Sequence, residues 1–100
     1  MTRINNMSAE KKHVQGIKKG DVLIYALSTC QWCRKMKELL NEIGIDYYYI
    51  DVDLIAGDDQ KDIIKELKQF NPACSFPTMV INERESIIGF DDEKIRDKFK

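Results

Sequence analysis

The sequence predicts an α/β domain in which a mixed four-stranded sheet is covered by three helices, in the order βαβαββα. Short apolar segments of strand length alternate with segments whose apolar residues recur every three or four positions, as on one face of a helix. The last two strand segments are separated by a short polar turn, which is typical of a hairpin. With 100 residues, 43% of them hydrophobic, the chain can enclose one core.

The first half of the domain is predicted to contain a strand, a helix and a second strand. Residues 22–27 are apolar almost throughout, as in a buried central strand. Residues 31–43 carry apolar side chains at helical spacing, and Gly44 is expected to end that helix. Residues 45–52 are rich in Ile, Tyr and Val, which favour a second strand.

A second helix is expected after a connector at residues 53–57. Asp58 or Asp59 can cap its first turn and complement its dipole. The pair Asn71-Pro72 is expected to end it, because a residue before proline is disfavoured in helical conformation.

The C-terminal part is predicted to form a hairpin and a helix. Residues 78–81 and 85–88 are the two strands, and residues 82–84 the turn between them. Gly89 breaks the second strand, and Asp91 is expected to cap the final helix.

Residues 1–20 are predicted to be a flexible, basic N-terminal extension, with some order near residues 14–17, and residues 21–100 to be the folded domain. The extension carries five Lys or Arg residues against a single acid, Glu10. A docking arm for an acidic partner is the alternative interpretation. We expect His13, the one histidine, to be a solvated bystander.

Net charge, the length of apolar runs and the number of cysteines indicate which partners and which cellular compartment to expect. A formal net charge of −1 gives no support to nucleic acid or an anionic membrane as partner. No apolar run approaches the roughly 20 residues that span a bilayer, and the N-terminus lacks the apolar core of a signal peptide. We therefore expect a cytoplasmic monomer. Three cysteines in such a compartment indicate redox or metal chemistry rather than a disulfide framework.

The chemistry is expected at Cys30 and Cys33, where the first strand gives way to a helix. The free N–H groups and positive dipole end of a helix start stabilise a thiolate, so the pKa of Cys30 should be lowered. Cys33 lies one turn further on the same face and can meet Cys30. We predict that Cys30 is the nucleophile and Cys33 the resolving thiol. Trp32, between them, is expected to be partly exposed as an apolar rim.

A zinc or iron–sulfur site is the alternative interpretation of the cysteine pair. A tetrahedral site needs two further ligands, and the remaining candidates are Cys74 and His13. This alternative corresponds to a carrier that binds a metal or cluster through Cys30. We expect no metal.

Three segments together resemble the glutaredoxin family, including the glutaredoxin-like hydrogen donor of ribonucleotide reductase. They are Cys30-Gln31-Trp32-Cys33, Phe76-Pro77-Thr78 and Gly89-Phe90-Asp91-Asp92, in the order and spacing of that family. The resemblance covers residues 21–100. It implies a thioredoxin-like fold and a cis Pro77 beside the cysteine pair.

The resemblance also implies a set of substrate-binding positions. Phe76 would pair through its backbone with an extended substrate or with glutathione, and the segment from Gly89 would meet a γ-glutamyl end. The expected substrate- or thiol-binding residues are Thr29, Gln31, Trp32, Phe76, Pro77, Gly89, Phe90, Asp91 and Asp92.

The chain departs from the family pattern at three places. Gln31-Trp32 replaces the usual Pro-Tyr, Leu27 stands where a lysine commonly meets glutathione, and Phe76 replaces a frequent Val. No tightly bound cofactor is expected, and glutathione or another thiol is the candidate reductant. Thioredoxin reductase and a ferredoxin-linked disulfide reductase are the alternatives. The expected substrates are protein disulfides, with ribonucleotide reductase as a candidate.

Other polar and sulfur-bearing residues receive simpler interpretations. Cys74 is expected in the loop beside Cys30, as a small apolar residue or as an accessory thiol. The acids expected at solvated edges and helix caps are Asp51, Asp53, Asp58, Asp59 and Glu66.

Overall fold

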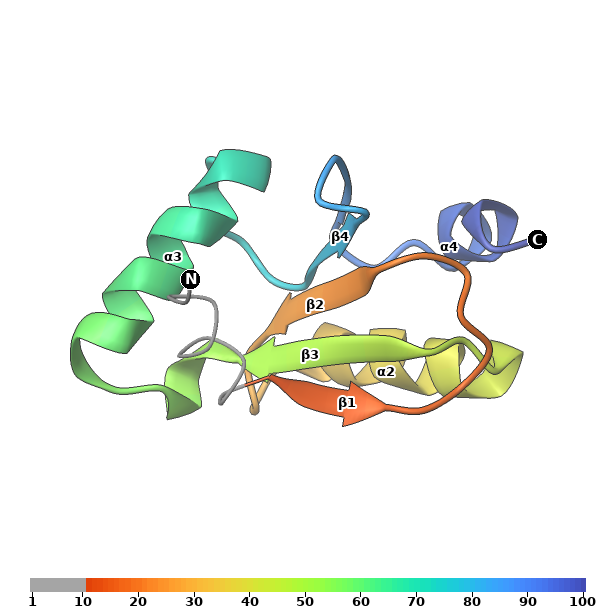
Figure 1. Cartoon of the computed structure of the whole chain (residues 1–100), viewed down its shortest axis with the longest axis horizontal. Helices are drawn as coiled ribbons and strands as arrows, with labels where there is room; N and C mark the ends of the chain where they lie inside the picture. The colour runs from red at the N-terminus through yellow and green to blue at the C-terminus, as the bar shows by residue number, and fades with distance from the viewer. Residues whose placement is uncertain (1–10) are drawn as a thin grey trace.

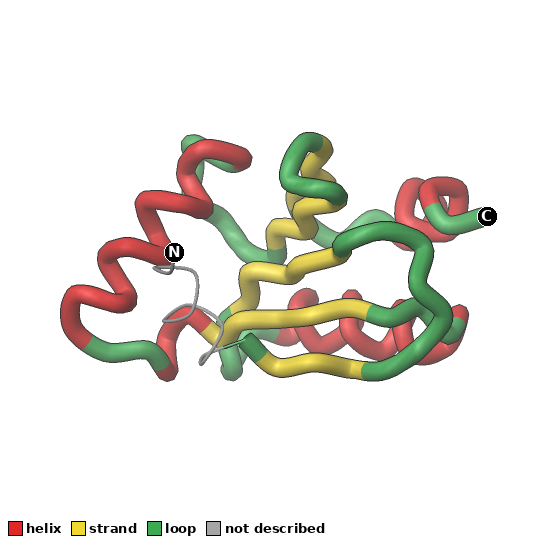
Figure 2. Tube along the Cα trace, viewed as in Figure 1, coloured by secondary structure: helices red, strands yellow, loops and turns green. Residues whose placement is uncertain are grey.

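The computed structural model describes residues 11–100, which form a mixed five-stranded sheet with strand order β1-β3-β2-β4-β5 (Figures 1 and 2). The strands are β1 Lys12–Val14, β2 Val22–Ala26, β3 Tyr47–Asp51, β4 Thr78–Ile81 and β5 Glu85–Ile88. The helices are α2 Gln31–Ile43, the 3-10 helix η1 Val52–Leu54, α3 Gly57–Phe70 and α4 Asp92–Lys98. None of these helices is both long and apolar enough to cross a membrane.

Two apolar layers hold the helices against the sheet. Side chains alternate along a strand, so β2 sends Val22, Ile24 and Ala26 to one face and Tyr25 to the other. The first face packs against α2 and α4, and the second against α3. In Figure 1, α2 accordingly lies behind the strands. β2 pairs parallel with β3 and antiparallel with β4, so it is the buried central strand that the sequence predicts.

The predicted order of elements is confirmed, but the sheet has five strands rather than four. β1 pairs antiparallel with β3, and Ile17 forms a further bridge with Ile45. Residues 12–14 and Ile17, which were expected to lie in the flexible extension, therefore pair with the sheet. Residues 1–10, the rest of the predicted extension, lie outside the described residues.

His13 is not a solvated bystander. Its Nε2 lies 2.9 Å from Oδ2 of Asp46, and its ring stacks on Tyr48 with 4.4 Å between centroids. These contacts fasten β1 to the segment that precedes β3. The hydrogen bond with His13 also holds the pKa of Asp46 below its ordinary value.

Most helix ends agree with the sequence prediction. Gly44 ends α2 at φ 76°, and the side chain of Asp91 caps α4 by accepting a hydrogen bond from the Lys94 N–H at 3.1 Å. The cap of α3 was predicted wrongly. Its N-cap is Ala56, which makes no side-chain cap, and Asp58 and Asp59 instead lie in the first turn, where their charges complement the dipole.

We predict that Gly16→Ala destabilises the docking of β1. A Cβ on Gly16 would lie 2.7 Å from the carbonyl oxygen of Gly44 and 2.7 Å from the carbonyl carbon of Ile45, both backbone atoms that cannot turn away. The expected loss is about 1–3 kcal/mol of unfolding free energy, measured by urea denaturation. Gln15→Ala, at an exposed neighbouring position, is the matched control and should change stability little. Equal stability of the two variants would contradict this account.

Candidate active site

Cys30 occupies the N-cap of α2, at the carboxyl end of the central strand. Its backbone is extended (φ −86°, ψ 120°), and its Sγ accepts a hydrogen bond from the Cys33 N–H at 3.2 Å. The sulfur therefore serves one of the free donors at the helix start, which is a place that stabilises an anion. Cys30 is partly exposed, so it is open to attack and to substrate.

Cys33 is enclosed in the core, with none of its surface exposed. It packs with Met36, Leu39 and Leu40 of the same helix against the sheet. Burial raises the pKa of the Cys33 thiol to about 12, and a hydrogen bond with Cys30 adds to the rise. One thiol of the pair is thus accessible while the other is held neutral and shielded.

The turn between β2 and α2 is tied to the segment that follows β3. The Asp53 carboxylate accepts hydrogen bonds from the Ser28 N–H at 2.8 Å and from the Ser28 hydroxyl at 2.5 Å. Both contacts hold the pKa of Asp53 below its ordinary value, the hydroxyl contact more strongly. Ser28 lies two residues before Cys30, so this clamp helps to fix the turn that carries Cys30.

Pro77 follows a cis peptide bond with Phe76, as the family resemblance implies. Its carbonyl oxygen accepts a hydrogen bond from the Gly89 N–H at 2.8 Å, which joins the loop before β4 to the segment after β5. A groove of about 230 Å³ lies between these segments and the start of α2. Its lining residues are Trp32, Phe76, Pro77, Gly89 and Phe90.

The aromatic wall of this groove consists of Trp32 and Phe90. Their rings stack with 5.9 Å between centroids, and Trp32 is 54% exposed, as predicted. The Lys35 ammonium lies 5.9 Å from the centroid of the Trp32 ring, within the range of a cation–π contact. The surface beside the cysteines is thus apolar and aromatic, with a cation at its edge.

Asp91 and Asp92, expected to meet a ligand, are both engaged within the protein. Asp91 caps α4, and Asp92 accepts from Arg96 Nε at 2.6 Å. Arg96 also pairs with Glu42 of α2 at 2.8 Å. Of the predicted binding segment Gly89-Phe90-Asp91-Asp92, only the apolar part, Gly89 and Phe90, lines the groove.

The remaining predicted positions lie around this centre. Thr29 and Gln31 are exposed on either side of Cys30. Cys74 is partly buried, packs on the α3 side of the sheet and has φ 54°. Among residues 11–100, no three His, Cys, Asp or Glu side chains are grouped so that they could hold a metal.

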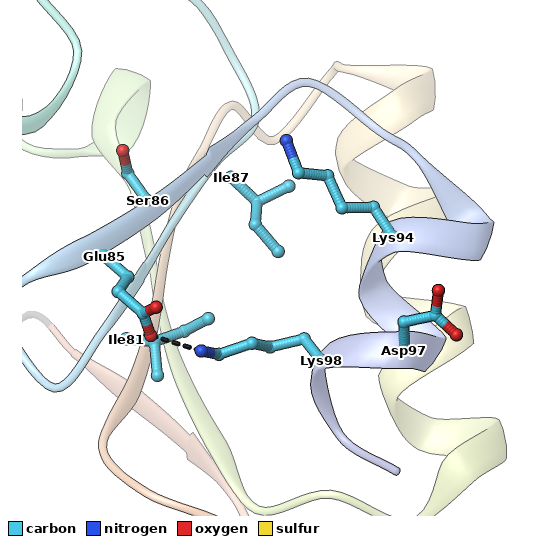
Figure 3. A pocket seen from close by; sticks show the side chains of 7 residues that line it. All are labelled: Ile81, Glu85, Ser86, Ile87, Lys94, Asp97 and Lys98. Carbon is cyan, nitrogen blue, oxygen red and sulfur yellow. Dashed lines mark hydrogen bonds and ion pairs between the residues drawn. The ribbon is translucent and has the colours of Figure 1, made fainter.

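A second groove, of about 310 Å³, lies between the hairpin and α4, and no cysteine lines it (Figure 3). An ion pair between Lys98 and Glu85 spans it. Its lining residues are Ile81, Glu85, Ser86, Ile87, Lys94, Asp97 and Lys98. The first groove, by contrast, is lined by Trp32, which lies between Cys30 and Cys33 in the chain, and by Pro77.

Residues 22–85 match the sequence pattern of glutaredoxins. The chain belongs to the glutaredoxin family. An uncharacterised glutaredoxin-like 8.6 kDa protein in the rubredoxin operon of Clostridium pasteurianum is 32% identical over 74 residues, which is 74% of this chain and 91% of that protein. Family membership and the Cys30–Cys33 pair together support a thiol–disulfide oxidoreductase type of function.

Solved structures of glutaredoxins share the fold. The glutaredoxin of Methanosarcina mazei Go1 superposes with a TM-score of 0.83 and 41% identity, covering 90% of this chain and 87% of that one. Methanoredoxin of Methanosarcina acetivorans gives 0.81 and 42%, covering 84% and 88%. The fold is therefore the thioredoxin-like fold of glutaredoxins, as the resemblance implied.

Several polar contacts near the site were missed by the sequence analysis. Asp53 and Asp51 were expected at solvated edges, yet Asp53 clamps Ser28, and Asp51 pairs with Lys37 at 3.2 Å. Glu66 likewise accepts a hydrogen bond from the hydroxyl of buried Tyr25 at 2.7 Å. The partners are 14 to 41 residues apart in the chain, and no local pattern marks them.

We predict that the reduced protein loses stability at alkaline pH because of Cys33. Its pKa is raised from 9.0 to about 12 in the folded state, so the unfolded chain releases the proton first. The stabilising contribution is complete below pH 9 and is lost as pH rises toward 12, by at most about 1.4 kcal/mol per pH unit. Urea denaturation of the reduced protein between pH 8 and about 10.5 measures it.

Cys33→Ala is the control for this experiment. Burial also raises the pKa values of Tyr25 and Tyr47, which act in the same direction, so the difference between wild type and variant isolates Cys33. The alkaline loss should be smaller in the variant. Parallel curves for the two proteins would show that Cys33 ionises normally in the fold.

Proposed function

We propose that the protein is a dithiol–disulfide oxidoreductase that reduces disulfide bonds of other proteins, with Cys30 as nucleophile and Cys33 as resolving thiol. The observation that carries this assignment is the unequal exposure of two sulfur atoms one helical turn apart. A partly exposed N-cap sulfur can reach a substrate, whereas a buried sulfur can reach only its neighbour.

The reaction takes two exchanges. The Cys30 thiolate attacks one sulfur of the substrate disulfide, so a Cys30–substrate bond forms and the other substrate sulfur leaves as a thiolate. Cys33 then loses its proton and attacks Cys30 Sγ. A Cys30–Cys33 disulfide forms, and the second substrate sulfur leaves and takes up a proton. Two electrons have passed to the substrate, and an external reductant must restore the pair.

The groove favours a polypeptide as the reacting partner. Its lining consists of aromatic rings, Pro77 and Gly89, without a charged side chain. Candidate substrates are protein disulfides, including that of ribonucleotide reductase, and the reducing environment of the cytoplasm is the compartment that such a reductant requires. The potential falls within the thioredoxin–glutaredoxin range, about −270 to −200 mV.

The electron donor is expected to differ from that of most glutaredoxins. Leu27 stands where glutaredoxins commonly carry a lysine for glutathione, and its side chain packs on the α3 side of the sheet. A charge-assisted contact contributes about 1.5–3 kcal/mol, roughly one to two decades of affinity. We therefore propose a weak response to glutathione, and a protein reductase or another small thiol as donor, with no tightly bound cofactor.

Cys30→Ser is expected to abolish disulfide reduction, by at least about 100-fold, because the attacking sulfur is lost. Cys33→Ser should instead accumulate a mixed disulfide with the substrate protein. An insulin-reduction assay, with mass spectrometry of the trapped species, measures both. Adducts trapped on Cys30→Ser rather than Cys33→Ser would reverse the roles, and full activity of Cys30→Ser would refute the proposal. Cys74→Ser is the control for the third thiol.

Leu27→Lys is expected to increase the rate of reduction by glutathione by about tenfold, because it supplies the missing cation. The lysine stem can cover the surface that Leu27 covers while its ammonium reaches solvent. The change in Trp32 fluorescence after mixing oxidised protein with glutathione follows the reaction. Leu27→Met is the uncharged control and should behave as wild type. Rapid reduction of wild type by glutathione would contradict the proposed effect of Leu27.

A further inference from the structure

Lys37 lies on α2 one turn beyond Cys33, on the same face of the helix. Its ammonium lies 3.2 Å from Oδ1 of Asp51 and 3.9 Å from the centroid of the Tyr49 ring. Its side chain is only 22% exposed and that of Asp51 only 15%. A lysine normally extends its charge into water, so this partly buried position requires the partners that hold it.

The position of Asp51 brings this cation close to the cysteine pair. Asp51 is the last residue of β3 and is paired in register with Ala26, four residues before Cys30. The Lys37–Asp51 pair therefore lies near the end of β2, where the turn that carries Cys30 begins. It forms no part of the groove lining, so substrate contact does not account for it.

Cys33 has a particular need for a nearby cation. Burial opposes its thiolate, whereas the backbone of Leu27 and the charge of Lys37 favour the thiolate and lower its pKa against that burial. The other titratable groups that face the pair are Cys30 on the same helix, Tyr49 and Asp51 on β3, and Asp53 on η1. From α4, Arg96 is already paired with Glu42 and Asp92.

We propose that the Lys37 ammonium, held in place by Asp51, is a positioning residue that promotes the resolving step by stabilising the thiolate form of Cys33. This inference rests on the proposed function, because it concerns the step in which Cys33 releases the substrate. In that step Cys33 gives its proton to water, its thiolate attacks Cys30 Sγ, and the departing substrate sulfur takes up a proton. Lys37 keeps its own proton throughout.

Loss of Lys37 should change the rate of the resolving step in two opposite ways, through the ionised fraction of Cys33 and through the nucleophilicity of its thiolate. If loss of Lys37 raises the pKa of Cys33 by about one unit, the thiolate fraction falls about tenfold at neutral pH. Each remaining thiolate becomes more nucleophilic, by about threefold for that change in pKa. The resolving step should therefore slow by about threefold, and the attack by Cys30 should remain as in wild type.

The test uses Ellman's reagent in a stopped-flow instrument, at one equivalent, in a Cys74→Ser background. The reagent's disulfide reacts with Cys30 and releases one coloured thiolate, at a rate that depends on reagent concentration. Cys33 then releases the second thiolate, at a rate that is independent of reagent concentration. The two phases separate nucleophilic attack from resolution in one trace.

Lys37→Met should slow the second phase about threefold and leave the first unchanged, whereas Lys37→Arg, which keeps the charge, should remain near wild type. Lys37→Gln gives the same comparison if the Met variant does not fold. Lys65→Met, at an exposed position on α3, is the matched control. The ¹³Cβ chemical shift of Cys33 gives its ionisation midpoint, which should move to higher pH in Lys37→Met.

The outcomes distinguish the inference from the proposed function. If wild type shows no second phase, Cys33 does not resolve and the proposed function fails. If wild type shows it and Lys37→Met resolves at the same rate, only the role of Lys37 is refuted. Equal slowing by Lys37→Arg, or an unmoved midpoint, would also refute it, because packing rather than charge would then be responsible.

Discussion

The hydrogen bond from the Cys33 N–H to Cys30 Sγ is the constraint on which the rest of the site depends. A helix start leaves its first N–H groups without backbone partners, and here a sulfur takes the place of the usual oxygen cap. Once Cys30 occupies the cap, the residue one turn later falls on the buried face of α2. The unequal exposure of the two thiols, and with it their proposed division of roles, thus follows from where the helix begins.

The sheet gives this helix start its surroundings. β2 runs between β3 and β4, so the turn after it meets the end of β3 on one side and the loop before β4 on the other. Asp53 clamps the turn from the first side, through Ser28. From the second side, Pro77 and the Gly89 N–H close the groove beside Trp32. Each contact joins segments that are adjacent in the sheet and far apart in the sequence.

This difference between local and distant determinants explains how much the sequence could predict. The bounds of α2, its Gly44 stop and the Asp91 cap are local patterns, and all three were predicted correctly. β1 has only three residues and no apolar alternation, and His13 holds it through contacts with Asp46 and Tyr48, which are distant in the sequence. The cis form of the Phe76–Pro77 bond was predicted from the family resemblance alone, because bonds before proline are far more often trans. In the sequence Lys37 is indistinguishable from other lysines of a helix, because its partner Asp51 becomes its neighbour only in the folded structure.

The burial of Cys33 raises the question of how so weak an acid can act as the resolving nucleophile that we propose. A pKa of about 12 leaves only about one thiol in 10⁵ ionised at pH 7. Well-oriented intramolecular reactions have effective molarities of about 10⁵–10⁸ M, which offsets that scarcity when the target sulfur is one helical turn away. A strongly basic thiolate is also the better nucleophile once formed. The closeness of Cys33 to Cys30 Sγ can therefore compensate for its burial in the proposed resolving step. The same burial prevents Cys33 from reacting with a disulfide that is not already attached to Cys30.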